Sequence, residues 1–136
     1  MNFIEYLDSQ NEENILIITN KIPKIDQENT KDIITHIAKE FSTALLKSQN
    51  KGYEHINCTL DLQEFKLTNI NYDFIKNLSD IMCQLFPNRL KNCFIINSPK
   101  LFVSSYKLIR NFIDPITRNK FIFIDGNNLI LCEELN

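Results

Sequence analysis

"QLFPNRLKNCFIINSPKLF", residues 84–102, places a proline turn, an apolar run and a second proline in close succession. Pro87 predicts the end of a preceding helix, because its ring disfavours helical geometry at the residue before it. The run 92–98 is short and rich in Ile and Phe, which is typical of a buried strand. Ser98 followed by Pro99 predicts a helix start, with the hydroxyl as N-cap and proline in the first turn. The stretch therefore predicts a helix, a strand and a further helix in that order.

The same alternation extends along the rest of the chain. Apolar residues spaced by three and four predict one helix capped by Asn29 or Thr30 and a second capped by Asn71. The third helix is predicted over 99–113. Short apolar runs between the helices predict strands at 14–21, 56–62, 92–98 and 120–124. The final apolar segment, 129–136, is compatible with either a strand or a helix.

Strands that alternate with helices indicate an α/β fold in which helices cross over a mostly parallel sheet. We expect a single domain, residues 1–136, built on four to five strands, because this length suits one hydrophobic core. The chain holds only two glycines, Gly52 and Gly126, so it contains no glycine-rich phosphate-binding loop.

The cysteines and histidines do not predict a metal site. Four cysteines are far apart without a C-x-x-C motif, and neither His36 nor His55 lies at ligand spacing from any of them. We expect reduced thiols in a cytoplasmic protein, with no metal and no cofactor. The first residues lack the pattern of a signal peptide, and no run approaches the roughly 18 apolar residues of a membrane span.

The charges are distributed unevenly along the chain. Residues 1–35 hold seven acids against three lysines, whereas residues 87–120 hold seven bases against the single acid Asp114. A basic segment in a chain of net charge −2 favours a local anionic partner over general nucleic-acid binding. The alternative is that these bases form ordinary solvated helix faces.

Three stretches match a known family in type and order. Strand 56–62 ends in Leu-Asp-Leu, and the opening stretch holds an aromatic-Pro-x-Arg turn followed by an Asn-x-Pro helix start. "FIDPITRNKFIFI", residues 112–124, holds a Pro-x-Thr-x-x-Lys turn before a strand. With this combination the chain resembles the CRAL-TRIO lipid-binding domain over roughly residues 56–124. The matching residues are Leu60, Asp61, Leu62, Phe86, Pro87, Arg89, Asn97, Pro99, Pro115, Thr117 and Lys120.

The resemblance implies a non-enzymatic module that binds or transfers a lipid under a mobile gate helix at 99–113. In phosphatidylinositol-binding members the turn threonine and lysine hold the headgroup phosphate, which implies that role for Thr117 and Lys120. A hydroxyl and an ammonium can both donate to phosphate oxygens, and Arg118 is expected to add charge nearby. The residues implied to line the pocket are Phe102, Tyr106, Ile109, Phe112 and Ile113. An anionic membrane surface, touched transiently, is the expected partner.

Other interpretations remain open from the sequence. Lys120 can be a solvated residue at a strand end, and Thr117 can stabilise its own turn. Asn88 stands where the inositol-binding members carry Glu. No Ser, His, Cys or carboxylate arrangement predicts catalysis. The alternative function is a protein-interaction or dimerising scaffold, in which Phe and Ile side chains fill the pocket and the basic face binds an acidic partner or another copy.

Overall fold

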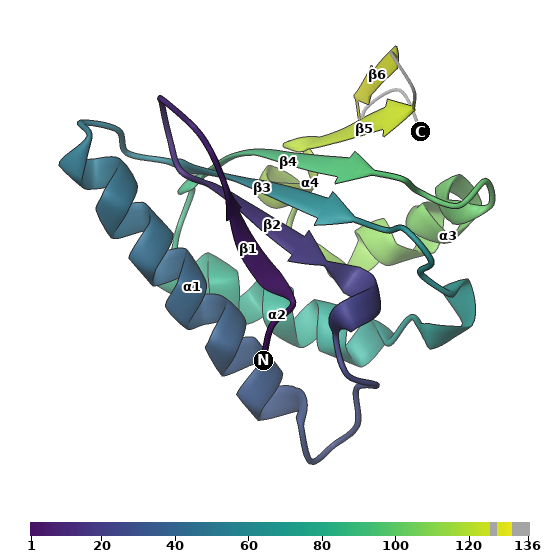
Figure 1. The fold of residues 1–136 in the computed structure, drawn as a ribbon. Coiled ribbons are helices and arrows are strands. Elements are labelled where there is room, and N and C mark those ends of the chain that lie inside the picture. Colours follow the sequence, from purple (N-terminus) through teal and green to yellow (C-terminus); the bar gives the residue numbers. More distant parts are fainter. Residues whose placement is uncertain (126–127, 132–136) are drawn as a thin grey trace.

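The computed structural model describes residues 1–125 and 128–131. Six strands form one sheet in the order β1-β2-β3-β4-β5-β6, with the helices between them (Figure 1). The strands are β1 (Ile4–Leu7), β2 (Asn14–Ile18), β3 (Ile56–Asp61), β4 (Leu90–Ile96), β5 (Phe121–Asp125) and β6 (Asn128–Leu131). The helices are α1 (Thr30–Asn50), α2 (Tyr72–Leu85), α3 (Phe102–Ile109) and α4 (Pro115–Arg118).

The mostly parallel α/β class is confirmed. Strands β2 to β5 pair in parallel, as helices crossing over between strands require, and β1 and β6 pair antiparallel at the two edges. The expected number of four to five strands was too low. Strand β1 has only four residues and carries no clear strand pattern, and the segment that contains β6 was compatible with either a strand or a helix.

Two of the predicted helix starts agree with the structure, and one does not. The backbone N–H of Phe74 donates to Oδ1 of Asn71 at 3.0 Å, so Asn71 caps α2 as predicted. Asn29 is the N-cap residue of α1, although its side chain accepts from Asp26 N–H instead of from the helix. The start predicted at Ser98-Pro99 is wrong, because α3 begins at Phe102.

The chain turns before α3 can begin. Asn97 has a φ of 56°, in the left-handed region, and its amide donates to Asp61 at 3.0 Å. The N–H of Phe102 then bonds the carbonyl of Pro99 at 2.9 Å, which closes a turn rather than a helical repeat. The expected helix 99–113 is thus an eight-residue helix followed by the 3-10 turn η3 (Arg110–Phe112).

Helices α1, α2 and α3 lie on the same side of the sheet (Figure 1). Successive residues of a strand point to opposite faces, so alternate residues of β2 to β5 face these helices. The buried core on that side includes Ile15, Ile17, Ile56, Cys58, Cys93, Ile95, Phe121 and Phe123 from the strands. The other face of the sheet carries no helix among the described residues.

Candidate functional site

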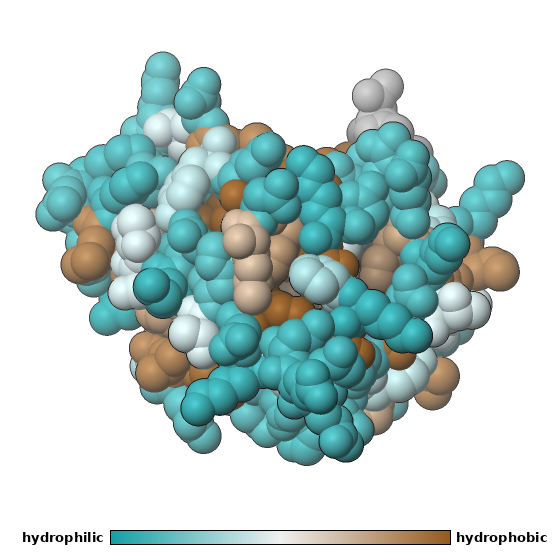
Figure 2. Space-filling model, turned by 60° about the horizontal axis from the view of Figure 1, so that its bottom comes forward, coloured by the Kyte–Doolittle hydropathy of each residue, from teal (hydrophilic) through white to brown (hydrophobic). Residues whose placement is uncertain are grey.

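A cavity of about 1490 Å³ lies on the helix side of the sheet. Figure 2 shows its opening as a hollow with apolar surface at the centre and polar surface around it. Strands β2 to β5 form the floor, and α2 with the segments 19–25 and 62–71 forms much of the wall. The space exceeds the roughly 300–1,000 Å³ that drug-sized ligands occupy. A cavity of this size favours a ligand site over the alternative of a pocket filled by Phe and Ile side chains.

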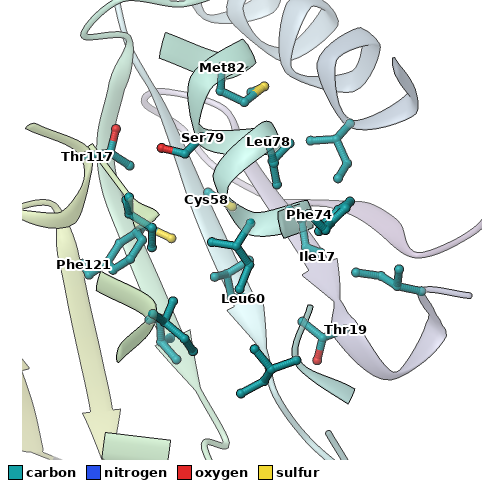
Figure 3. A pocket seen from close by; sticks show the side chains of 18 of the residues that line it. Ile17, Thr19, Cys58, Leu60, Phe74, Leu78, Ser79, Met82, Thr117 and Phe121 are labelled. Atoms are coloured by element: carbon teal, nitrogen blue, oxygen red, sulfur yellow. The ribbon is translucent and has the colours of Figure 1, made fainter. Parts of the chain in front are cut away.

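The hollow exists because α2 packs loosely on the sheet. Its apolar residues recur at helical spacing, yet Phe74 is the only one that is fully buried. Leu78 and Met82 remain half-buried and line the cavity. In Figure 3, Phe74 and Leu78 of α2 lie across the cavity from Cys58 and Leu60 of β3. The amphipathic pattern of α2 thus supplies a cavity wall instead of a packed helix–sheet contact.

Helix α3 packs much more closely than α2. Its inner face is buried at Phe102, Tyr106 and Ile109, although the helix has only eight residues. The Tyr106 ring meets the Phe123 ring edge-on at 5.1 Å, and the Phe102 and Phe123 rings lie 5.9 Å apart. Aromatic pairs at such distances stabilise the contact beyond the area they bury. The α3 segment therefore borders the cavity, while the larger wall belongs to α2.

Four of the five residues expected at the pocket line the cavity. These are Phe102, Tyr106, Ile109 and Ile113. Phe112 does not belong to the lining, and its ring lies 5.3 Å from the ring of Tyr72. Phe112 lies within η3, which winds more tightly than an α-helix, and its side chain leaves the stripe that the sequence spacing suggested, whereas Ile113 stays on it.

Lys120 lies at one end of the cavity and is held by the protein. Its ammonium donates to Oδ1 of Asn88 at 2.6 Å and to the backbone carbonyl of Leu90. Burial lowers the pKa of Lys120, and the carboxylate of Asp114 partly offsets this shift. An ammonium has three N–H donors, so one remains beyond the two bonds found among the described residues. The interpretation of Lys120 as a fully solvated lysine is not supported.

Thr117 also faces the cavity, at the end opposite Thr19 (Figure 3). Its backbone N–H donates to Oδ2 of Asp114 at 3.0 Å, and its hydroxyl lies 3.3 Å from the same oxygen. Asp114 thereby caps α4, and its own N–H donates to the hydroxyl of Ser79 at 3.1 Å. The corner thus combines one cation, one carboxylate and two hydroxyls, whereas the sequence suggested one hydroxyl with two cations.

Arg118 does not line the cavity. Its guanidinium donates to the backbone carbonyl of Arg110 at 3.1 Å, which fixes it against the end of η3. Arg89 also lines the cavity, and its guanidinium forms an ion pair with Glu54 at 2.8 Å.

Two buried thiols lie side by side on the cavity floor. Cys58 and Cys93 are register partners on β3 and β4, and each is 3% exposed. A hydrogen bond with Cys58 and burial raise the pKa of the Cys93 thiol well above its ordinary value. Neutral, buried thiols behave as small apolar groups, so this part of the floor suits hydrocarbon. No group of three or more His, Cys, Asp or Glu within the described residues is placed to hold a metal.

Sequence reasoning missed the role of α2 and of the loops around it. The stripe of Phe74, Leu78 and Met82 was visible in the sequence, but a stripe alone does not distinguish a core face from a cavity wall. The role of Asn88 as the acceptor for Lys120 was not anticipated. Asn88 has a φ of 54°, a conformation that asparagine adopts more readily than most residues, and this turns its side chain toward β5.

The structure is a one-sided α/β domain with a large, mainly apolar cavity between its helices and its sheet. The model of the CRAL/TRIO domain family matches residues 1–135. The chain therefore belongs to the CRAL/TRIO domain family.

Curated relatives agree with this assignment. A CRAL-TRIO domain-containing protein of Saccharomyces cerevisiae is 34% identical over 117 residues, which cover 79% of this chain and 37% of the relative. The Sec14 cytosolic factor of Schizosaccharomyces pombe is 35% identical over 80 residues, covering 57% of this chain and 28% of that protein. The chain thus spans well under half the length of these relatives.

A solved structure has the same fold. The crystal structure of Sfh5 matches with a TM-score of 0.59 at 16% sequence identity, over 90% of this chain and 46% of that one. At this level of identity the match shows the fold alone. Within the described residues, no helix combines the length and the hydropathy needed to cross a membrane.

Proposed function

We propose that the chain is a non-enzymatic module that binds a single lipid and transfers it between membranes. The observation that carries the proposal is the apolar cavity of about 1490 Å³ between α2 and the sheet. A water molecule takes about 30 Å³ of liquid, so the space holds roughly 50 groups of that size. That capacity suits the acyl chains of a lipid and is larger than a small polar metabolite needs.

Acyl-chain burial would supply most of the affinity. Each methylene removed from water contributes about 0.8 kcal/mol, and the floor offers apolar partners such as Cys58, Leu60 and Ile95. Leu78 and Met82 face these residues from α2. Because the cavity already exists in the protein, binding would not require the core to open.

The headgroup would lie at the end of the cavity marked by Thr117 and Lys120. Lys120 supplies one N–H donor beyond its bonds to Asn88 and Leu90, and the Thr117 hydroxyl, which donates to Asp114 at 3.3 Å, would turn to a phosphate oxygen. A phosphoinositide or another anionic lipid is the proposed ligand, because a phosphate accepts strongly from an ammonium and the CRAL/TRIO resemblance favours an inositol headgroup. Arg118 would act through its charge alone, since it does not line the cavity.

Membrane contact would use the outer surface beside α3 and α4. Leu101, Leu108 and Ile116 are exposed large apolar residues, and Lys100 and Lys107 are exposed bases in the same segment. Each base near an anionic membrane contributes roughly 1 kcal/mol, while the apolar side chains enter the interface. The segment 99–113 would act as the gate, since α3 starts without a side-chain cap. The relative from Schizosaccharomyces pombe is named a cytosolic factor, which favours a cytoplasmic protein that touches membranes transiently.

Uptake from vesicles tests the proposal. Purified protein is mixed with vesicles of phosphatidylcholine containing phosphatidylinositol, and the lipid retained after gel filtration is measured by mass spectrometry. Lys120→Glu should reduce phosphatidylinositol uptake by more than tenfold, because it replaces the donor with a second carboxylate beside Asp114. Lys66→Glu, at a cavity-lining base among the residues preceding α2, is the matched control and should bind normally.

Three outcomes would contradict the proposal. Protein that retains no lipid of any class excludes the transfer function. Equal uptake by Lys120→Glu and the unaltered protein removes Lys120 from the headgroup site. Loss of uptake in Lys66→Glu alone places the headgroup near the segment 62–71 instead.

A further inference from the structure

The face of the sheet turned away from the helices carries apolar side chains on β2, β4 and β5, with the polar residues Asn57, Thr59 and Asp61 of β3 between them and Glu5 on β1 at the edge. Successive side chains of a strand point to opposite faces of the sheet. In β2, β4 and β5, the residues that alternate with the cavity-lining residues therefore point to the face without helices. Its large apolar side chains are Leu16, Ile18, Phe94, Ile96, Ile122 and Ile124, each half-buried. We call this set the open face. No described helix or loop segment covers it, and all three long helices lie on the opposite side (Figure 1).

An uncovered face is unusual for this kind of sheet. Sheets of parallel strands occur almost only with both faces covered, and contiguous apolar patches beyond a few hundred Å² mark interaction sites. Strands lie about 4.8 Å apart and rise about 3.3 Å per residue, so six strands of five residues offer roughly 400 Å² of flat area. Two such faces give roughly 800 Å² before the relief of the side chains is added, which is below the roughly 1,200–2,000 Å² of stable interfaces and is compatible only with a weak association.

The polar groups on the open face are arranged so that the face complements itself. Asn14, Asn57 and Asn92 form a row across β2, β3 and β4, and Asp61 lies on the same face of β3 toward its carboxyl end. If two copies meet with their strands antiparallel, each Asp61 approaches the amide row of the other copy. An amide donates and a carboxylate accepts, so the same surface satisfies itself around a two-fold axis.

We propose that two copies of this chain associate through the open face and form a symmetric sheet-on-sheet dimer. The apolar stripe meets its own copy, as the inner faces of stacked sheets do. Among the residues that the structure describes on this face, none is a base that would select an acidic partner, and Lys91 at the sheet margin is paired with Glu12 at 3.0 Å. The cavity lies on the other side of the sheet, so both copies keep their ligand sites accessible and this inference does not depend on the lipid proposal.

Sedimentation and light scattering from roughly 1 to 100 µM test the dimer, since the small area predicts affinity in the micromolar range. The unaltered protein should show a mass that rises from monomer to dimer. Phe94→Glu at the centre of the open face should remain monomeric throughout, because association would bury its charge. Leu108→Glu, on the exposed outer surface of α3, is the matched control and should dimerise normally.

A second variant distinguishes loss of the dimer contact from misfolding of the protein. Ile124→Lys lies nearer the sheet edge on β5 and should weaken association at least tenfold, with circular dichroism confirming the fold of each variant. A protein that stays monomeric at 100 µM overturns the inference, and so does a dimer that survives both Phe94→Glu and Ile124→Lys. Loss of the dimer in Leu108→Glu alone places the contact on α3 and also overturns it. Normal lipid uptake by a monomeric Phe94→Glu would leave the lipid proposal intact.

Discussion

Leu78→Trp offers a direct test of whether ligand occupies the space beneath α2. Leu78 lies on the cavity side of α2, and Figure 3 shows it directed toward the strands. Replacing Leu by Trp adds roughly 60 Å³, which is about two water-sized groups and therefore about two methylenes of an acyl chain. At about 0.8 kcal/mol per methylene the loss is about 1.6 kcal/mol, or roughly 15-fold in affinity.

The assay uses the absence of tryptophan from the natural chain. The introduced indole is the only one present, so its fluorescence reports directly on a brominated phospholipid that enters the cavity. We expect strong quenching at saturation, together with the weakened affinity measured by competition with unlabelled lipid.

Leu46→Trp on α1 is the matched control, because Leu46 is 59% exposed and does not line the cavity. Its fluorescence should not be quenched in solution, and its affinity for lipid should equal that of the natural chain. A folded Leu78→Trp variant with unchanged affinity and no quenching would refute the reasoning, because the ligand would then lie elsewhere.

Two further predictions concern the stability of the fold. Asn71→Ala removes the acceptor for the Phe74 N–H and should lower the free energy of unfolding, measured by urea titration, by about 1 kcal/mol. Asn77→Ala, on the exposed side of α2, is the control and should change that free energy little. Equal losses in the two variants would contradict a capping role for Asn71. Backbone hydrogen bonding and the bond from Lys91 lower the pKa of Glu12, so its contribution to stability is present at neutral pH and is lost as the pH falls through the folded-state pKa. Glu12→Gln should therefore reduce the loss of stability on acidification, with Glu28→Gln as the exposed control, and an unchanged acid dependence would show that the pair is unimportant.

The parallel strands were predictable because each is a short apolar run between turn residues. Strand β1 was not, since its pattern at Ile4–Leu7 is only four residues long and alternates with Glu5. Its position depends on tertiary contacts: the hydroxyl of Tyr6 donates to the carboxylate of Glu40 on α1 at 2.9 Å, a pairing 34 residues away in sequence. Local propensity carries no information about such a contact.

The candidate site was only partly predictable for a similar reason. Thr117 and Lys120 share a turn, so their proximity follows from spacing. The acceptors of Lys120 lie about 30 residues earlier, and only the β4–β5 pairing brings them together. The position of the cavity depends on how tightly α2 and α3 pack, because both carry apolar stripes. That difference arises from the aromatic contacts of α3 with β5 and is not encoded in either stripe alone.

Photo-crosslinking with a phospholipid that carries a diazirine at the end of one acyl chain tests the central claim most directly. Peptide mapping by mass spectrometry would then locate the adduct along the chain. If the acyl chains occupy the cavity between α2 and the sheet, label should appear within residues 56–62 and 72–85, at positions such as Leu60 and Leu78. Label confined to exposed residues such as Leu101 and Leu108, or no label at all, would contradict it.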